Sequence, residues 1–402
     1  LKILENGPES VELAHAISAI SRMHMLASEN EQAIIWGERA LALAERLGAE
    51  EVIVHALNNL GTSLTPSIDP ERGLRLLQDS LDRALVLNLP QHLCRAYLNI
   101  SESLVWNCRY VEAEESFGKL LAFSRQTHIP LSEGVALVGL AGLDNWTGHW
   151  KEMLERREEI LAWYDETLPL GMVQILASTL LGRIYNDLGQ YDLARQELES
   201  SLSNARTIDE LNFTVPHLGQ LARTLTIFGL DREVFDLVRE FLALIEHTPS
   251  SHALSIHPLL FACRWLANRS DSQDIKLFHG CLNSLKQIEA HSPTLESRAA
   301  LAEGQGYDAL KNQDVSSAIK YFRQAVKSWG DLGRPYDQVR ALSSLGQTLN
   351  HAGDVKESQS IYIQSSNLIA GLAEQLEDRE QKSAFLTSQL IKDIREQKER
   401  YS

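Results

Sequence analysis

Residues 180–194, with the sequence LLGRIYNDLGQYDLA, decide the fold of this chain. The stretch reads as the end of one helix, a tight turn and the start of a second helix. Gly182 lies on the first helix and Ala194 on the second, and small residues at these places let two helices approach closely. Leu181 and Tyr185 are large enough to fill the space between neighbouring hairpins. The stretch therefore predicts a helical hairpin that packs against further hairpins of the same kind.

The order of these residues matches the leucine, glycine, tyrosine and alanine positions of the tetratricopeptide repeat, or TPR. The same pattern recurs with starts near residues 14, 54, 94, 134, 175, 215, 255, 299 and 339. A plain TPR has about 34 residues, so each unit here is longer by roughly one and a half helical turns. The unit near residue 255 is degenerate, because Asp274 occupies the place of its second small residue.

Glycine and proline fall where the hairpins should join, which supports the same division of the chain. These breakers are Gly48, Pro66, Pro70, Pro90, Pro130, Pro169, Gly171, Pro249, Pro293, Gly333 and Pro335. We therefore expect an all-α, TPR-like α-solenoid, a right-handed superhelix of about nine helix pairs over residues 1–373.

The last segment, residues 374–402, is rich in charge and is predicted to be a C-terminal capping helix. A repeat array needs a terminal element with one wet face. An apolar stripe runs along this segment and suits that role; it consists of Phe385, Leu386, Leu390, Ile391 and Ile394. The alternative is a helix for dimerisation or docking.

Length and charge narrow the functional classes. A chain of 402 residues is too long for one compact core. Its 38 basic and 54 acidic residues give a net charge of −16, which argues against direct binding of nucleic acid. The four cysteines are far apart, as expected for free thiols in a reducing, cytoplasmic location. No apolar run is long enough to cross a membrane. Because the sequence opens at Leu1 in a helix-like stretch, we expect it to be part of a longer protein.

Motifs for catalysis and cofactor binding are missing from the sequence. There is no phosphate-binding loop, no zinc-protease motif and no hydrolase nucleophile motif. Gly304 and Gly306 imitate a dinucleotide fingerprint, but no strand precedes them, and Gly306 already has a place in the repeat. His149 lies between Trp146 and Trp150, in a turn where Trp150 is expected to pack inside its hairpin. We predict no enzyme activity, no cofactor and no metal site.

Candidate binding residues come from the first helix of each repeat, whose positions 2, 5, 9 and 12 line the concave face of a TPR array, with position 13 nearby. Guanidinium and amide groups dominate these positions, and they suit carboxylates, phosphates or the backbone of an extended peptide. Tryptophan adds apolar anchors. The alternative is that polar residues simply cover these faces or contact adjacent repeats. The candidates are Arg22, His55, Asn58, Arg95, Glu102, Trp106, Asn145, Trp146, Arg183, Asn186, Arg223, Gln347 and Asn350.

Three stretches indicate which kind of TPR protein this chain resembles. They are EQAIIWGERALALAERLG at 31–48, HALNNLG at 55–61 and ALSSLG at 341–346. Their wording resembles the C-terminal sensor regions of large bacterial signalling ATPases, the MalT-like, LuxR-type regulators and the ATPase-linked cyclases. The resemblance implies an ATPase module upstream and a DNA-binding or cyclase module elsewhere in a parent chain. None of these modules occurs in this sequence.

The resulting functional prediction is a non-enzymatic scaffold that binds a protein, a peptide or a small effector in its concave groove. It would act as the sensor or interaction arm of a bacterial signalling or transcription-regulating ATPase and contact that ATPase. Two alternatives stay open at this stage. One is a free-standing adaptor for protein–protein interaction, and the other is a receptor for a peptide pheromone.

Overall fold

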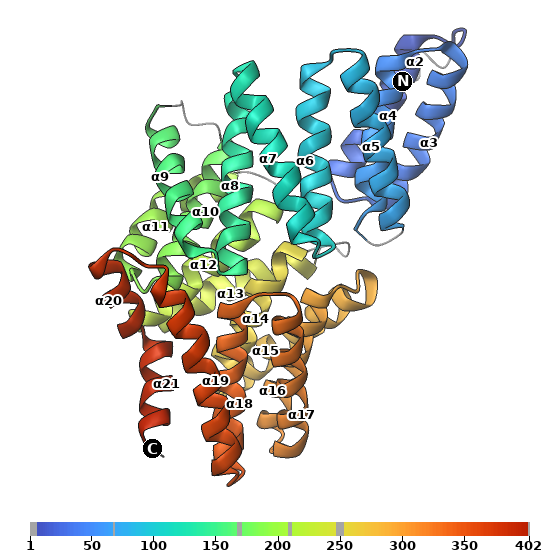
Figure 1. The fold of residues 1–402 in the computed structure, drawn as a ribbon. Coiled ribbons are helices and arrows are strands. Elements are labelled where there is room, and N and C mark those ends of the chain that lie inside the picture. Colours follow the sequence, from blue (N-terminus) through green and yellow to red (C-terminus); the bar gives the residue numbers. More distant parts are fainter. Residues whose placement is uncertain (1–5, 67–68, 167–170, 208–210, 247–252, 401–402) are drawn as a thin grey trace. The chain divides into compact units, whose positions relative to one another are not determined.

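A computed structural model describes residues 6–66, 69–166, 171–207, 211–246 and 253–400 (Figure 1). The described chain divides by its internal contacts into two units, residues 1–137 and residues 138–402, and each unit is described by itself below. All regular structure in the described residues is helical, as the sequence predicts. None of the described helices is long and apolar enough to cross a membrane.

The first unit contains three complete helix pairs, each with its two helices packed against one another. Their helices are α2 (Val11–Leu26), α3 (Asn30–Leu47), α4 (Glu50–Leu64), α5 (Pro70–Val86), α6 (Pro90–Trp106) and α7 (Tyr110–Thr127). A fourth pair begins with α8 (Pro130–Thr147). Repeat starts near residues 14, 54 and 94 fall within α2, α4 and α6.

The second unit continues the series of pairs. It holds α9 (Trp150–Glu166), α10 (Gly171–Asp187), α11 (Tyr191–Thr207), α12 (Leu211–Ile227), α13 (Asp231–Glu246), η1 (Ala253–Ser255), α14 (Ile256–Leu266), α15 (Ser272–His291), α16 (Leu295–Lys311), α17 (Val315–Asp331), α18 (Pro335–His351) and α19 (Val355–Glu374). The degenerate repeat near residue 255 is α14 with α15, and its first helix has only 11 residues.

Local sequence explains where many helices begin and end. Pro70, Pro90 and Pro335 stand at the first turn of their helices, where the missing N–H is no loss. Asp69 accepts a hydrogen bond from the backbone N–H of Arg72 and so caps α5. Gly48 ends α3 with a φ of 64°, a conformation that glycine adopts without strain. Of the predicted breakers, Pro169 and Pro249 lie outside the described residues.

The small residue on the first helix of a repeat makes room for a large residue on the second, as the sequence predicts. A Cβ atom added to Gly182 on α10 would lie 2.5 Å from Cγ of Leu198 on α11. The same holds for Gly306, where an added Cβ would lie 2.6 Å from the ring of Phe322. Helix pairs therefore approach closely at this position because no side chain separates them.

The end of the chain differs from the single capping helix expected over residues 374–402. It forms two helices, α20 (Arg379–Thr387) and α21 (Gln389–Glu399), with a break at Ser388. The apolar stripe is split accordingly: Phe385 is buried on α20, whereas Ile391 and Ile394 are buried on α21, which packs on α19.

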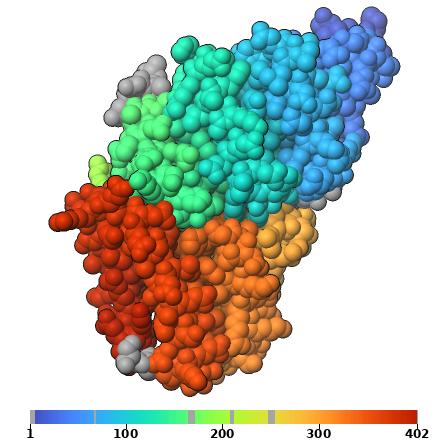
Figure 2. All heavy atoms as spheres, in the orientation of Figure 1, coloured from blue at the N-terminus to red at the C-terminus, as the bar shows by residue number. Residues whose placement is uncertain are grey.

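The C-terminal helices also reach back to the first helices of their unit. The ring of Phe385 lies 4.9 Å from that of Trp150, and Gln375 accepts a 2.8 Å hydrogen bond from the backbone N–H of Trp150. The side-chain amide of Gln375 donates to the carbonyl of Gly148 at 2.7 Å. Figure 2 shows the C-terminal segment in red against the green segment near residue 150. Trp150 was expected to pack inside its own hairpin. In the structure it also packs against the C-terminal segment.

We predict that Gly182→Ala lowers the free energy of unfolding by about 1–3 kcal/mol, because its new methyl group overpacks the contact with Leu198. Gly371→Ala on α19 is the matched control, since nothing lies within 4 Å of an added Cβ there. That change should be neutral or stabilise by up to about 1 kcal/mol. Urea unfolding of both variants measures the difference, and equal stabilities would contradict this account of the close approach.

Candidate functional site

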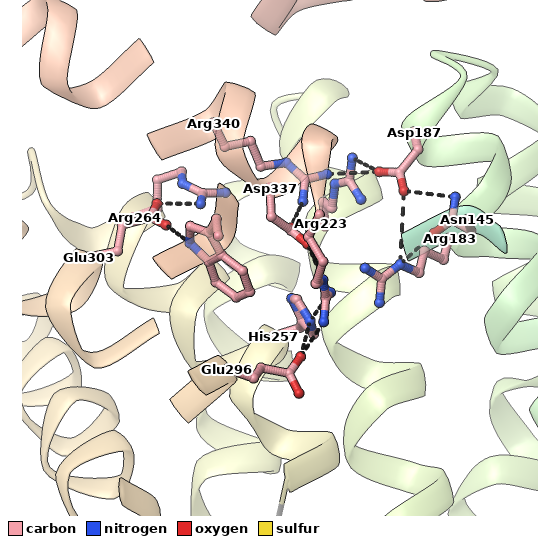
Figure 3. Close-up of polar contacts among 12 residues, drawn as sticks. Asn145, Arg183, Asp187, Arg223, His257, Arg264, Glu296, Glu303, Asp337 and Arg340 are labelled. Atoms are coloured by element: carbon pink, nitrogen blue, oxygen red, sulfur yellow. Dashed lines mark hydrogen bonds and ion pairs between the residues drawn. The ribbon is translucent and has the colours of Figure 1, made fainter. Parts of the chain in front are cut away.

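Asp187, at the end of α10, collects cationic side chains from three helices of the second unit (Figure 3). Its carboxylate lies 2.7 Å from Arg223 on α12 and 2.8 Å from Arg340 on α18. Arg183, one turn earlier on α10, is more distant, at 3.9 Å. Burial alone would raise the pKa of Asp187, but the arginines outweigh it and the pKa is lowered. Asp187 therefore stays ionised and joins α10, α12 and α18.

Asn145 and Trp146 on α8 complete the surroundings of Arg183. The Nε of Arg183 donates a 3.0 Å hydrogen bond to Oδ1 of Asn145, while the Nδ2 of Asn145 donates to Asp187 at 3.3 Å. The guanidinium of Arg183 also lies 5.3 Å from the centre of the Trp146 ring. Because this cation has weaker pairing than Arg223, burial lowers its pKa to about 10.

A second cluster surrounds Arg334, whose side chain is fully buried just before α18. It donates to Glu296 on α16 at 2.5 Å and to Asp337 at 2.8 Å. Its guanidinium stacks on the rings of Trp146 and Trp329, at 5.0 and 5.2 Å. Arg340 also contacts Asp337, at 3.0 Å, so it links this cluster to Asp187.

The two carboxylates beside Arg334 are strongly acidic. Burial would raise the pKa of Glu296, but Arg334 and then His257 lower it to about 2. The same competition lowers the pKa of Asp337. The ring of His257 on α14 lies 3.0 Å from Glu296 and 2.6 Å from Arg334, and burial together with Arg334 lowers its pKa. His257 is therefore neutral at pH 7.

Glu303 on α16 forms the third cluster. It accepts from Arg264 on α14 at 2.5 Å and from the indole N–H of Trp329 at 3.3 Å. The hydroxyl of Tyr307 donates to the same carboxylate at 3.3 Å and lies 2.7 Å from the hydroxyl of Ser344 on α18. These contacts again tie α18 to the helices that precede it.

The three clusters together pair five arginines with four carboxylates, so most of the buried charge is compensated inside the unit. A pocket of about 30 Å³ lies among Arg223, His257, Arg264, Asp337 and Arg340, enough for one or two waters. Among the described residues, no group of three or more His, Cys, Asp or Glu side chains is arranged to hold a metal ion. This network therefore acts mainly as a structural link between α18 and the earlier helices.

The first unit presents a different polar face on α2, α4 and α6. His55 on α4 is 8% exposed and lies 2.7 Å from the hydroxyl of Ser18. Its ring stacks on that of His15 at 5.8 Å and meets that of His92 edge-on at 6.1 Å. Burial, and then the nearby cations and histidines, lower the pKa of His55 to about 3. The histidine ring is therefore neutral at pH 7.

Arg95 on α6 lacks a carboxylate partner among the described residues. Its Nη2 donates to Oδ1 of Asn59, but its Nη1 is buried without a hydrogen-bond partner. Burial and the charge of Arg22 lower its pKa to about 9. Asn58 is 1% exposed and accepts a 2.6 Å hydrogen bond from Asn99, while its own Nδ2 has no partner in the described chain. We call the surface formed by His15, Arg22, His55, Asn58, His92, Arg95, Asn99, Glu102 and Trp106 the α2–α4–α6 face.

The candidates predicted from the sequence thus fall into two groups. Arg22, His55, Asn58, Arg95, Glu102 and Trp106 belong to the α2–α4–α6 face, and Asn145, Trp146, Arg183 and Arg223 belong to the network around Asp187. The remaining three are outside both groups. Asn186 is fully buried and accepts from Thr224 at 3.0 Å, Gln347 is exposed on α18, and Asn350 is half-buried there.

The network contains residues that the sequence analysis did not select, and these are chiefly its carboxylates, Asp187, Glu296, Glu303 and Asp337. The sequence could have pointed to Asp187, because it is an acidic residue at position 13 of its repeat. None of the other eight repeats has an acidic residue at position 13. In order, these repeats have Leu26, Pro66, Trp106, Trp146, Ile227, Ala267, Lys311 and His351.

Comparison with known proteins supports the repeat assignment. Tetratricopeptide repeat family models match residues 177–207 and 304–362. Together with the paired helices, these matches show that the chain contains tetratricopeptide repeats. They do not single out the sensor regions of signalling ATPases. A search of curated protein sequences finds no match.

Comparison with solved structures finds further similar chains. A Rap protein complexed with competence and sporulation factor has a TM-score of 0.63 and 12% identity, covering 91% of this chain and 99% of that one. The human IFIT1 dimer with m7Gppp-AAAA has a TM-score of 0.43 and 12% identity, with coverage of 89% and 91%. Yeast Tom70 has a TM-score of 0.35 and 14% identity, with coverage of 97% and 96%. At 12% identity, the likeness to the Rap protein shows the fold alone.

We predict that Asp187→Asn lowers the free energy of unfolding by about 3 kcal/mol or more, because it leaves three guanidinium groups around one neutral amide. Asp192→Asn on α11 makes the same chemical change at an exposed position and should stay within about 0.5 kcal/mol of the wild type. Urea unfolding followed by near-UV circular dichroism measures both. Equal midpoints would show that the network does not stabilise the second unit.

Acid should weaken the network in a defined window. Because the folded pKa of Glu296 is about 2, below the ordinary value of 4.5, its contribution is complete above about pH 4.5 and is lost as the pH falls towards 2. The contribution amounts to about 3 kcal/mol. We expect Glu296→Gln to be less stable than the wild type at pH 7 and to lose less stability between pH 5 and 2.5. Glu380→Gln, at an exposed position on α20, should keep the wild-type slope.

Proposed function

We propose that this chain is a non-enzymatic TPR receptor that binds an extended peptide on the α2–α4–α6 face. The peptide acts as a signal, and its binding regulates a protein partner. This choice follows the alternative of a pheromone receptor in preference to the arm of a signalling ATPase. The likeness to the Rap protein supports it, because that protein was solved in complex with a competence and sporulation factor.

The observation that carries the proposal is the unsatisfied hydrogen-bonding capacity of the α2–α4–α6 face. The Nδ2 of Asn58 and the Nη1 of Arg95 are buried and have no partner among the described residues. A buried donor without a partner costs about 1–3 kcal/mol, so a ligand that supplies an acceptor recovers this free energy. The backbone of an extended peptide supplies such carbonyl acceptors at regular intervals.

The arginines in the three clusters of the second unit offer less to a ligand, although they are more numerous. Arg183 and Arg223 both lie beside Asp187, and Arg264 is paired with Glu303. A ligand that took one of these cations would leave a buried carboxylate uncompensated, which is costly. For this reason we place the peptide on the first unit.

A second hypothesis is that the chain is the sensor arm of a signalling ATPase, contacts that ATPase and is cytoplasmic. This hypothesis rests on the resemblance of residues 31–48, 55–61 and 341–346. It is compatible with peptide binding, because a sensor arm also needs a ligand. A free-standing adaptor would use the same face for the tail of a partner protein. Both readings share the binding surface, so the test below addresses all three.

A pool of random heptapeptides, passed over the immobilised chain and analysed by mass spectrometry, tests the function. We expect a subset to be retained. At about 100 times its Kd, a retained peptide should slow hydrogen exchange in α2, α4 and α6 by up to about 100-fold. Helices α3, α5 and α7 are the internal control and should change less.

Two outcomes would contradict the proposal in different ways. If the pool gives no retained peptide, the chain is not a peptide receptor. If peptides are retained but protection appears in α10, α12 and α14 instead, the peptide lies against the Asp187 network and the assignment to the first unit is wrong.

A further inference from the structure

Helix α6 carries an arginine and a glutamate on one face, and neither has an oppositely charged partner among the described residues. Arg95 and Glu102 are seven residues apart, which places them about 10 Å apart along the helix and on the same side. That separation is too long for a direct ion pair. Glu102 forms no hydrogen bond or ion pair with another described residue, and burial raises its pKa to about 7. Arg95 likewise lacks a carboxylate partner in the described chain.

The surroundings of Arg95 are those of an anion site. Arg22 on α2 is close enough to lower the pKa of Arg95, and three histidine rings from α2, α4 and α6 stand beside them. His92 lies 3.6 Å from Glu51, whose side chain is exposed. Since His55 is neutral at pH 7, the two arginines give the cluster its positive charge.

A carboxylate fits the free side of this guanidinium best. The Nη1 of Arg95 has no partner in the part of the chain that the structure describes, whereas its Nη2 donates to Asn59, which holds the plane of the group in place. A planar carboxylate can accept two parallel hydrogen bonds from a guanidinium, and such charge-assisted bonds are about twice as strong as neutral ones. Arg95 is therefore oriented for a carboxylate that the described residues do not provide.

Glu102 requires the opposite charge. A buried carboxylate with no cation nearby is stabilised by an ammonium or guanidinium group from outside. The distance of about 10 Å between the two positions on α6 corresponds to about three residues of an extended peptide. Trp106 follows Glu102 by one turn on the same helix and is half-buried, so it adds an apolar contact at this end of the face.

We propose that the peptide bound by the α2–α4–α6 face carries a carboxylate, which pairs with Arg95, and an amino or guanidinium group about three residues away, which pairs with Glu102. The carboxylate is a peptide C-terminus or an acidic side chain. This inference rests on the proposed function, because it names the chemical class of the same ligand.

The composition of the retained heptapeptides tests both contacts. The wild type should enrich a carboxylate together with Lys or Arg about three residues away. Arg95→Gln should lose the preference for the carboxylate, with affinity for such peptides falling about tenfold or more, and Glu102→Gln should lose only the preference for Lys or Arg. Arg75→Gln, an exposed position on α5, removes the same charge as Arg95→Gln and should leave both preferences intact. Peptides with amidated C-termini distinguish a terminal carboxylate from an acidic side chain.

Arg95→Gln and Glu102→Gln should also leave the melting temperature unchanged or raise it, because each replaces a half-buried ionisable group that has no oppositely charged partner among the described residues. Loss of a preference therefore reports on the ligand contact and is not a consequence of misfolding. If the retained peptides show no charge preference, or if Arg95→Gln and Glu102→Gln keep the wild-type preferences, the inference is overturned while the proposed function stands.

A small probe tests the carboxylate site even if the pool gives no retained peptide. N-acetylglycylglycine at millimolar concentration should shift the imidazole NMR signals of His55 and His92 in the wild type but not in Arg95→Gln. Its amide should have no effect in either protein. Shifts caused by the acid alone would keep the anion site although the receptor function had failed. The absence of shifts, or shifts with inorganic phosphate only, would overturn the carboxylate assignment.

Discussion

Compensation of buried charge is the constraint on which the two units depend, and they meet it differently. An arginine or carboxylate taken out of water needs an opposite charge and hydrogen bonds, or it destabilises the fold. In the second unit Asp187, Asp337, Glu296 and Glu303 supply that compensation from α10, α16 and α18. In the first unit Arg95 and Glu102 have no oppositely charged partner among the described residues. The buried charges are therefore paired with one another in the second unit, whereas Arg95 and Glu102 in the first unit are available to a ligand.

The closed network also explains how the end of the chain is held. Arg340 and Asp187 are 153 residues apart in the sequence, and Gln375 contacts Trp150 across 225 residues. Polar contacts of this kind have strict geometry, while apolar packing of Phe385 on Trp150 adds area without direction. Together they fix α18 to α20 against the beginning of the second unit. Arginines that join helices in this way are already paired with carboxylates of the same unit. A high density of arginine therefore does not by itself mark a ligand site.

The repeats were predictable from the sequence because their signals are local. Gly182 and Leu198 are 16 residues apart within one hairpin, and Pro70, Pro90 and Gly48 act on the turn in which they stand. The network was not predictable, because the pairing of Arg223 and Arg340 with Asp187 depends on how successive hairpins rotate relative to one another. That rotation accumulates along the array and has no local code. The break at Ser388 escaped prediction because the apolar stripe continues across it.

The net charge of −16 adds a further constraint on any ligand of the first unit. A plainly acidic peptide is attracted to Arg22 and Arg95 but repelled by the rest of the protein, over a range of about 8–10 Å at physiological salt. A purely basic peptide is attracted by the overall field but meets Arg95 unpaired, and it leaves the buried donor unsatisfied. A ligand that carries both charges approaches without net repulsion and pairs with both Arg95 and Glu102. The overall charge and the local cluster therefore select the same class of ligand, although neither was sufficient to define it alone.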